Sequence, residues 1–378
     1  MGQKSILFLT TTHVFKKELI GIKNKIIAQN RAMINLGYNV DFISIDEPNA
    51  IFINHNLLVK FSNKFLYSLF FFFKLTKALS NKSYDYIYIR NPFIFDQIGF
   101  LYFLRKHKAS YIILELPTFP YKKERTSLYQ RATYLSEFLF RGLYKRYIKI
   151  VLYSGNKVDT IFGINAFQIK HGGNFEGTKI NALEKDFKKI NLIAVASFSK
   201  WHGFERLLNG INDYKSNSNS DCEVHLFLVG DREPLFSEYK YFIESNRLEN
   251  LITMTGNLQG KELEDIFQKC HIGIGSLGMH RIGLLEGSPL KSAEYAVRGI
   301  PFVVGYKDST FFDKNYCFQI SGDESPLNIS DVIKWYKGIN LEKESMRKFT
   351  LNNFSWENQL FDILSIKKKM SNKTCGHI

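Results

Sequence analysis

The stretch from Gly283 to Gly305, GLLEGSPLKSAEYAVRGIPFVVG, decides how the second half of the chain folds. We expect Ser288 to cap a helix that runs from Pro289 to Arg298, because a Ser side chain accepts from first-turn amides and Pro suits the first helical position. Gly299 ends this helix, since a left-handed cap carries no steric penalty without a β-carbon. The apolar run from Pro301 to Gly305 then predicts a parallel strand buried on both faces.

Two glutamates flank the start of this helix. Glu286 lies in the loop before it, and Glu294 lies within it, eight positions later (294 − 286 = 8). One carboxylate is therefore expected at the helix start and the other along its flank, around amide groups that favour an anion. The alternative is a solvated loop residue and a charge on the helix surface.

Composition indicates a folded protein of about two domains. The chain has 378 residues, of which 45% are hydrophobic and 23% are charged. Its net charge of +15 suits nucleic acid, anionic lipid or phosphorylated substrates, and excludes only a preference for cationic partners. Four scattered cysteines without a CxxC pair argue against a disulfide framework or a zinc site and fit a reducing cytosol.

No signal peptide is evident, and no apolar run approaches the roughly 18 residues of a membrane span. We therefore expect a cytoplasmic protein, with peripheral contact at the inner face of the cell membrane left open. Two segments, Leu57 to Leu79 and Phe138 to Lys149, combine aromatic and basic residues. They fit either core helices with a solvated basic face or helices at an anionic bilayer surface.

Both halves of the chain alternate strands and helices. The expected strands are 5–10, 40–45, 86–89, 111–114 and 148–153 in the first half, and 192–196, 224–229, 252–255 and 272–274 in the second. This order predicts two Rossmann-like α/β domains with parallel strands, in which ligands bind beyond the carboxyl ends of the strands. A site is therefore expected in a cleft between the domains. The first half has no GxGxxG motif, so a dinucleotide site is not expected there.

The second half resembles the donor-binding domain of the retaining group 1 (family 4) glycosyltransferases. The resemblance rests on an ordered series: VASFSKWHGFERLL, LFLVGDRE, TGNLQGKELEDIFQKCHIGIG, the E-x7-E pair with RGIPFVVG, and NNFSWENQL. It covers about Ile169 to Phe361 well and the first half only in layout. It implies the GT-B arrangement, with an acceptor-side domain at 1–170, a donor-binding domain at 171–356 and a C-terminal helix at about 357–378 that crosses back to the first domain.

The resemblance also implies a donor site around the E-x7-E pair. Glu286 would lie near hydroxyls of the donor sugar as a catalytic residue, and Glu294 would contact the ribose of the nucleotide. The amides of Gly287, Ser288 and Leu290 would lie near the diphosphate. Sugar transfer builds negative charge on the departing diphosphate, so oriented dipoles and cations aimed at it are worth more than a strong base.

The cations depart from the family pattern. Relatives carry an Arg and a Lys where this chain has Ser197 and His202, and a His compensates phosphate charge only when it is protonated. Lys200, Lys291 and Arg281 are the candidate substitutes, although either lysine could equally be a solvated surface residue. His280 and Arg281 also precede Glu286 closely enough to contact a sugar, unless both are ordinary loop residues.

On the acceptor side, the candidate residues follow strands of the first half. Gly21 matches the family's glycine-bearing loop or is an ordinary turn glycine, and Arg90, Asn91, Glu115 and Thr118 are expected to line the cleft. Relatives place a His near the Glu115 region, but the nearest one here is His107. Glu115 would act as a base on the acceptor hydroxyl, or cap neighbouring amides instead.

These features predict a retaining hexosyltransferase that needs no metal and no cofactor, since no DxD motif stands at the donor site. It would transfer a sugar from a nucleotide diphosphate sugar to a glycan or polyprenyl-diphosphate-linked acceptor, as in the synthesis of bacterial capsule or O-antigen. The alternatives are a GT-B epimerase and a non-catalytic nucleotide-sugar-binding partner. Binding of nucleic acid is suggested only by the charge and is not expected.

Overall fold

The computed structural model describes residues 3–13, 20–90, 93–125, 127–170, 172–173, 175, 177–216 and 222–374. The chain forms two compact units: Met1–Asn174 with Phe354–Ile378, and Phe175–Asn353. The predicted boundaries at 170 and 356 lie within four residues of these limits. None of the described helices combines the length and the apolar character needed to cross a membrane.

The first unit is built on a nine-stranded sheet of order β4-β3-β2-β1-β5-β6-β7-β9-β8. Strands β2, β1, β5, β6, β7 and β9 are parallel, whereas β3, β4 and β8 pair antiparallel at the edges. The strands are β1 (Ser5–His13), β2 (Asn39–Ile45), β3 (Ala50–Ile53), β4 (Asn56–Lys60), β5 (Tyr86–Arg90), β6 (Tyr111–Phe119), β7 (Ile148–Gly155), β8 (Thr160–Ile161) and β9 (Ile164–Gln168). The five strands expected in this half are all present.

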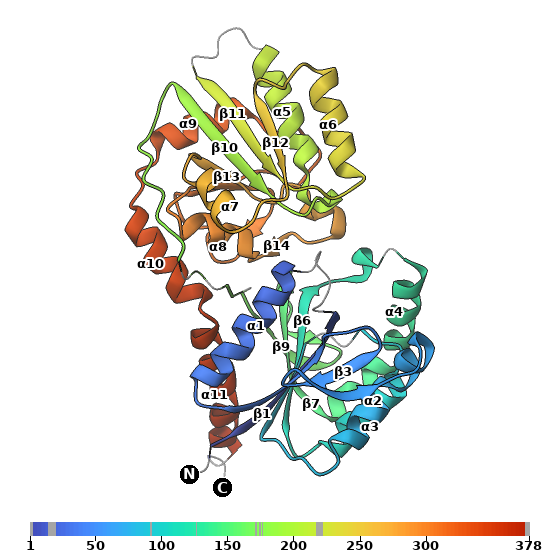
Figure 1. The fold of residues 1–378 in the computed structure, drawn as a ribbon. Helices are drawn as coiled ribbons and strands as arrows, with labels where there is room; N and C mark the ends of the chain where they lie inside the picture. Colours follow the sequence, from blue (N-terminus) through green and yellow to red (C-terminus); the bar gives the residue numbers. More distant parts are fainter. Residues whose placement is uncertain are drawn as a thin grey trace. The chain divides into compact units, whose positions relative to one another are not determined.

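Helices cover both faces of this sheet (Figure 1). In β1, Leu7 and Leu9 point into one apolar cluster with α2 and α3, while Ile6 and Phe8 point into another with α1 and α11. This alternation explains why the central strands carry apolar residues on both faces. The helices are α1 (Ile20–Asn35), α2 (Lys64–Ala78), α3 (Gln97–Lys106), α4 (Leu128–Phe140) and α11 (Trp356–Thr374), with 3-10 turns η2 (Lys122–Glu124) and η3 (Arg141–Arg146).

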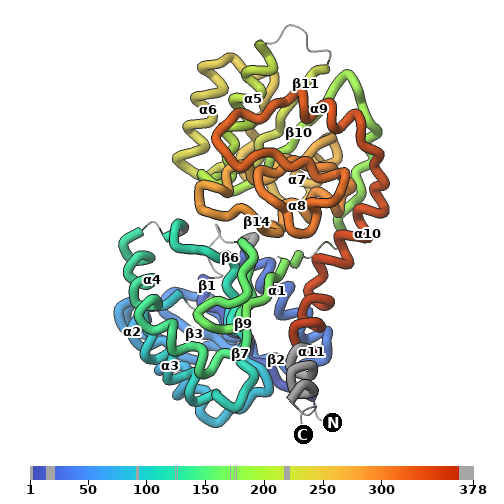
Figure 2. The backbone as a smooth tube through the Cα atoms, turned by 180° about the vertical axis from the view of Figure 1, so that it is seen from behind, coloured from blue at the N-terminus to red at the C-terminus, as the bar shows by residue number. Residues whose placement is uncertain are grey.

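The last helix, α11, packs in the first unit, as predicted (Figure 2). Its Trp356 and Leu360 lie in the cluster that α1 shares with the sheet. Gly172 passes so close to the Trp356 ring that a β-carbon there would lie 2.6 Å from it. Asn35 of α1 also donates to Oε1 of Glu357, at 3.3 Å.

The second unit is built on a six-stranded sheet of order β12-β11-β10-β13-β15-β17, in which every pair is parallel. Helices α5, α6 and α9 pack into the cluster on one face, and Tyr295 of α8 stacks on Phe302 on the other. The strands are β10 (Lys189–Val195), β11 (Glu223–Val229), β12 (Ile252–Gly256), β13 (Ile272–Ile274), β15 (Phe302–Val304) and β17 (Cys317–Gln319), with β14 (Glu286–Gly287) and β16 (Lys307–Asp308) as a separate parallel pair. The helices are α5 (Phe204–Ser216), α6 (Leu235–Ser245), α7 (Gly260–Phe267), α8 (Leu290–Ala296), α9 (Ile329–Gly338) and α10 (Lys343–Phe354), with 3-10 turns η4 (Lys200–His202) and η5 (Met279–Ile282).

The stretch from 283 to 305 folds in the predicted order, with one correction at the helix start. Gly299 has φ of +69°, and β15 is fully buried. Helix α8, however, begins at Leu290 with Pro289 at its N-cap and no side-chain capping bond. The prediction that Ser288 caps the helix is wrong, because its hydroxyl lies 2.8 Å from Oγ1 of Thr310 instead.

Candidate functional site

The candidate donor site is formed by loops at the carboxyl ends of β10, β11 and β13. After β10 the chain makes the turn η4, and after β13 it makes η5. Gly203 ends η4 at φ of +62°, where a β-carbon would lie 2.6 Å from the backbone nitrogen of Gly278. Leu277 donates to the carbonyl oxygen of His202 at 2.7 Å. Two glycines therefore let the backbones of the two loops touch and place His202 beside η5.

His202 and Lys291 meet at the centre of this corner. The backbone N–H of Ser199 donates to Nδ1 of His202 at 3.1 Å, and Nε2 lies 2.8 Å from Nζ of Lys291. Burial, together with the charges of Lys291 and Arg232, holds the pKa of His202 well below its usual range. The ring is therefore neutral, and a neutral imidazole has a single acceptor nitrogen, which accepts from either the Ser199 N–H or the Lys291 ammonium group. The imidazole of His202 and Nζ of Lys291 thus lie side by side.

Arg232 is a second cation at this corner, and it was not predicted from the sequence. It follows β11 in the loop after Gly230, and its Nη1 donates to Oγ of Ser199 at 3.3 Å. The predicted strand order could have indicated Arg232. Strand β11 is the direct neighbour of β10, so the loops after the two strands lie at the same edge of the sheet. Ser197, at the position where the resemblance predicted an Arg, is exposed and uncharged.

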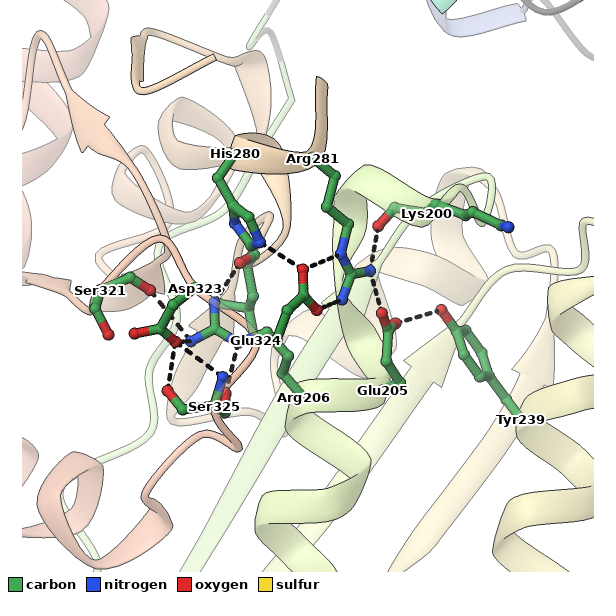
Figure 3. A network of polar contacts seen from close by, with 11 residues as sticks. Lys200, Glu205, Arg206, Tyr239, His280, Arg281, Ser321, Asp323, Glu324 and Ser325 are labelled. Atoms are coloured by element: carbon green, nitrogen blue, oxygen red, sulfur yellow. Dashed lines mark hydrogen bonds and ion pairs between the residues drawn. The ribbon is translucent and has the colours of Figure 1, made fainter. Parts of the chain in front are cut away.

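Arg281 is held by carboxylates (Figure 3). Its Nε donates to Oε1 of Glu324 at 2.9 Å, its Nη1 to the carbonyl oxygen of Lys200 at 2.7 Å, and further ion pairs join it to Glu205 and Glu324. The hydrogen bond to Glu324 raises its pKa. The expectation that Arg281 reaches the diphosphate is therefore not supported, because its three nitrogens bind protein oxygens.

The same network fixes His280 and the loop that carries Glu324. Nε2 of His280 lies 2.6 Å from Oε1 of Glu324, and bonds from Arg281 and His280 lower the pKa of Glu324 to about 2. Arg206, which is buried, donates to the carbonyl oxygens of Ser325 at 2.6 Å and Ser321 at 3.1 Å. In Figure 3 the ammonium group of Lys200 points away from this network. Lys200 is exposed and remains a candidate cation.

Glu286 lies in β14, just before α8. Its partner across the short sheet is Lys307 of β16, whose Nζ lies 3.8 Å from Oε1 of Glu286. The Glu286 side chain is 23% exposed, so its carboxylate still reaches solvent. Gly287 is buried behind it, with Met279 of η5 as the nearest neighbour of a β-carbon, at 4.0 Å.

A buried polar cluster supports this segment from behind. Oδ1 of Asp308 accepts from the backbone N–H groups of Thr310 at 3.0 Å and Phe311 at 3.2 Å. The Ser292 hydroxyl of α8 lies 3.0 Å from the hydroxyl of Tyr306, which donates to Oδ2 of Asp308 at 3.5 Å. Burial raises the pKa of Asp308 to about 6. These bonds fix the distance between β16 and the first turn of α8.

Glu294 lies on α8 and is half-buried. Its carbonyl oxygen accepts from Nη1 of Arg298 at 2.8 Å, and Arg298 itself pairs with Glu264 of α7 at 2.7 Å. Leu290 is the first residue of α8 and lies one position before Lys291. The predicted donor residues Glu286, Leu290, Lys291 and Glu294 thus belong to one short segment, as the sequence requires.

The first unit corrects the expectation for Glu115. Strand β6 continues through Pro117 to Phe119, so Glu115 and Thr118 lie within a strand and not after it. Glu115 is fully buried and pairs in register with Arg90, the last residue of β5. Nε of Arg90 lies 3.1 Å from Oε1 of Glu115, without hydrogen-bond geometry. Oε2 of Glu115 accepts from Tyr88 and Gln29, both at 2.8 Å.

This environment favours a structural role for Glu115, because a buried ion pair enclosed by two further donors is not open to an acceptor hydroxyl. Gly21 is also placed differently from the prediction: it is the second residue of α1, not part of a loop. Asn91 lies outside the described residues. In the described part of the chain, no three His, Cys, Asp or Glu side chains are grouped as a metal ion would require.

Comparison with known proteins gives a likeness in structure alone. No family model and no curated protein sequence matches the chain. Among solved structures, a sucrose-phosphate synthase from Thermosynechococcus elongatus aligns with TM-score 0.66 and 12% identity over 98% of this chain and 100% of that chain. HepE of Anabaena in complex with UDP-glucose aligns with TM-score 0.64 and 14% identity, over 96% and 100%.

A further solved structure with a similar fold is described as an epimerase. This structure, from Listeria monocytogenes and described as a UDP-N-acetylglucosamine 2-epimerase, aligns with TM-score 0.55 and 10% identity over 98% of both chains. At these identities the likeness is one of fold. The chain has the GT-B fold, with two Rossmann-like domains.

Proposed function

We propose that the protein is a retaining glycosyltransferase that transfers a sugar from a nucleotide diphosphate sugar to a glycan or polyprenyl-diphosphate-linked acceptor. The observation that carries this proposal is the corner where Nζ of Lys291 lies 2.8 Å from Nε2 of His202, with Arg232 beside them. A phosphate oxygen placed there would accept charge-assisted hydrogen bonds from Lys291 and Arg232. The GT-B fold supports the assignment, since sucrose-phosphate synthase and the UDP-glucose complex of HepE have it.

Lys291 and Arg232 take over the role of the cations that the sequence lacks at 197 and 202. Helix α8 has seven residues, about two turns. Side-chain charges at its start therefore carry the anion binding in this proposal, not a helix dipole. Negative charge that develops on the departing diphosphate would be stabilised by Lys291 and Arg232.

The two glutamates take separate roles in this proposal. Glu286 precedes α8 and retains a solvent-accessible carboxylate, which suits contact with hydroxyls of the donor sugar. Glu294 lies in α8, about one turn from its start, and suits the ribose of the nucleotide. The proposal requires no metal ion, because the cations of the side chains serve the diphosphate.

The acceptor side of the proposal rests on the first unit. The basic and aromatic helices of the first unit support an acceptor carried on lipid, as in the synthesis of bacterial surface polysaccharide. Glu115 does not serve as the acceptor base in this proposal, because it is fully buried in an ion pair with Arg90. In a retaining transfer the departing phosphate oxygens can accept the proton of the acceptor hydroxyl, so the site needs no separate base of this kind.

The first experiment is a thermal-shift screen of nucleotide sugars and nucleoside diphosphates, because a ligand that binds only the native state raises its stability. The nucleotide that stabilises the protein is then used with Glu294→Ala and Glu286→Ala. We expect Glu294→Ala to weaken nucleotide affinity and Glu286→Ala chiefly to lower turnover. Transfer or donor hydrolysis at the parent rate in both variants would contradict the site assignment.

Product analysis separates the alternatives. An epimerase would release an isomerised sugar nucleotide without any acceptor, and the epimerase that aligns with the chain makes this a real candidate. A non-catalytic binding partner would show the thermal shift without transfer, hydrolysis or isomerisation. Ser197 at the expected Arg position is the observation that favours the binding partner.

A further inference from the structure

One face of the first unit is unusually rich in exposed apolar side chains. Helices α2, α3 and α4 together leave many of them in solvent. The most exposed are Phe65 (69%), Ile98 (72%), Leu128 (84%), Leu135 (60%) and Leu139 (70%). Phe70, Phe73, Phe95, Tyr102, Tyr129, Phe138 and Leu143 are exposed by 38–51%. We call this set the helical face.

The three helices that carry these side chains lie side by side and contact one another (Figure 2). Phe73 of α2 stacks on Tyr102 of α3, with ring centroids 5.7 Å apart. The hydroxyls of Ser68 in α2 and Tyr129 in α4 lie 3.2 Å apart. Ser136 of α4 donates to the carbonyl oxygen of Phe95 at 3.2 Å, just before α3.

The surface is also held rigidly, because Asp96 joins α2 to α3. Oδ1 of Asp96 accepts from Gly99 at 2.8 Å and caps α3. Its Oδ2 accepts from the backbone N–H of Phe72 at 2.9 Å, just after Phe70 departs from helical geometry. One buried carboxylate thus stabilises the break in α2 and the start of α3. The backbone on either side of the break, which carries Phe70 and Phe73, is therefore held in place.

The charge on the same elements is almost entirely positive. Three basic residues lie in α2, two in α3, one in α4 and three in η3, which together make nine: Lys64, Lys74, Lys77, Arg105, Lys106, Arg131, Arg141, Lys145 and Arg146. Their one carboxylate is Glu137, which is buried and accepts a hydrogen bond from Tyr121. The exposed part of these elements therefore offers apolar and cationic groups without a counter-charge of its own.

We infer that the helical face docks on an anionic lipid bilayer. Aromatic and aliphatic side chains enter the interface, and each Lys or Arg near an anionic bilayer raises the partition coefficient about fivefold. A second copy of this chain fits the face less well, because two surfaces that each carry nine cations repel one another. The sequence segments 57–79 and 138–149 contribute to the face, but α3 and most of α4 were not predicted to.

The inference concerns a surface distinct from the donor site and does not depend on the proposed function. The test is co-sedimentation with vesicles of phosphatidylcholine mixed with phosphatidylglycerol, at low and high salt, with pure phosphatidylcholine vesicles for comparison. We expect binding to the anionic vesicles at low salt that weakens as salt is added. Replacing Phe73, Ile98 and Leu139 together with Ser should lower the partition coefficient about tenfold or more.

The matched control replaces three equally exposed side chains elsewhere, Phe187, Tyr241 and Phe361, with Ser. A second pair of variants tests the charge. One variant reverses the charge at Lys74, Lys106 and Arg131, and its control reverses it at three lysines exposed outside the helical face, Lys261, Lys334 and Lys348. Circular dichroism checks that each variant is folded. No binding at low salt, or equal binding by face and control variants, overturns the inference. So does loss of self-association in the face variants without loss of vesicle binding.

Discussion

The role proposed for Lys291 follows from the absence of a cation at positions 197 and 202. With Ser at 197 and a neutral imidazole at 202, positive charge at the donor corner must come from another element, and α8 supplies it with Nζ 2.8 Å from Nε2 of His202. Sequence order alone suggested Lys291 only as one of three substitutes. The choice depends on tertiary contacts, because Arg281 finds its carboxylate Glu324 at a distance of 43 residues along the chain.

Lys291→Met should weaken binding of the stabilising nucleoside diphosphate by about 10- to 100-fold, since a hydrogen bond to a charged group contributes about 1.5–3 kcal/mol. Binding of the corresponding nucleoside, which lacks phosphate, should hardly change. Isothermal titration of both ligands measures the two effects. Lys261→Met, at an exposed lysine of α7, is the control and should bind like the parent. Equal losses for nucleoside and diphosphate would argue against a phosphate contact.

Asp308 makes the stability of the second unit depend on pH. Its pKa is raised from 3.8 to about 6 in the folded state, so the native protein binds more protons than the unfolded chain between these values. Stability should therefore fall as pH rises through this window, by on the order of 3 kcal/mol. Asp308→Asn keeps an acceptor for the amides of Thr310 and Phe311 but does not titrate. Urea unfolding from pH 4 to 7 should show a weaker dependence in this variant, and parallel curves would refute the assignment.

At the scale of elements, the sequence predicts best where burial is strongest. Parallel strands covered on both faces appear as unbroken apolar runs, which is why β10, β11, β13 and β15 could be predicted closely. The prediction ended β6 too early, at residue 114, because the strand continues through Glu115 and Pro117 to Phe119. The pairing of Glu115 with Arg90 follows from the neighbouring positions of β6 and β5, which no local pattern reveals.

The contact between η4 and the loop before η5 can be tested through Gly203. Gly203→Ala forces a positive φ on alanine and brings its β-carbon to 2.6 Å from the nitrogen of Gly278. Gly256→Ala is the matched control, because φ is +71° but nothing lies within 4 Å of the added carbon. We expect about 1 kcal/mol of destabilisation at Gly256 and about 2–4 kcal/mol at Gly203. Similar urea midpoints for the two variants would mean that the loops are not in close contact.

At the scale of the whole molecule, the C-terminal helix belongs to the unit that begins the chain. Trp356 is buried against Gly172 in the cluster shared by α1 and α11. Trp356→Ala should therefore destabilise the first unit by about 3–5 kcal/mol. Nucleotide should stabilise the second unit as before, which a thermal shift with and without ligand measures. Phe361→Ala, at an exposed position on the same helix, should cost far less. Loss of nucleotide binding in the Trp356 variant would contradict this division.

The assignment of residues 354–378 to the first unit has a consequence for biosynthesis. Chain emerges from the ribosome in sequence order, so residues 175–353 are complete before Trp356, Leu360 and Leu364 become available to the first unit. During translation, the cluster formed by Ile6, Phe8 and Ile26 lacks its last helical cover until residues 356–364 have been made. The unit encoded first is therefore the last to finish its core, and its apolar surface stays uncovered for longer than that of the unit encoded second.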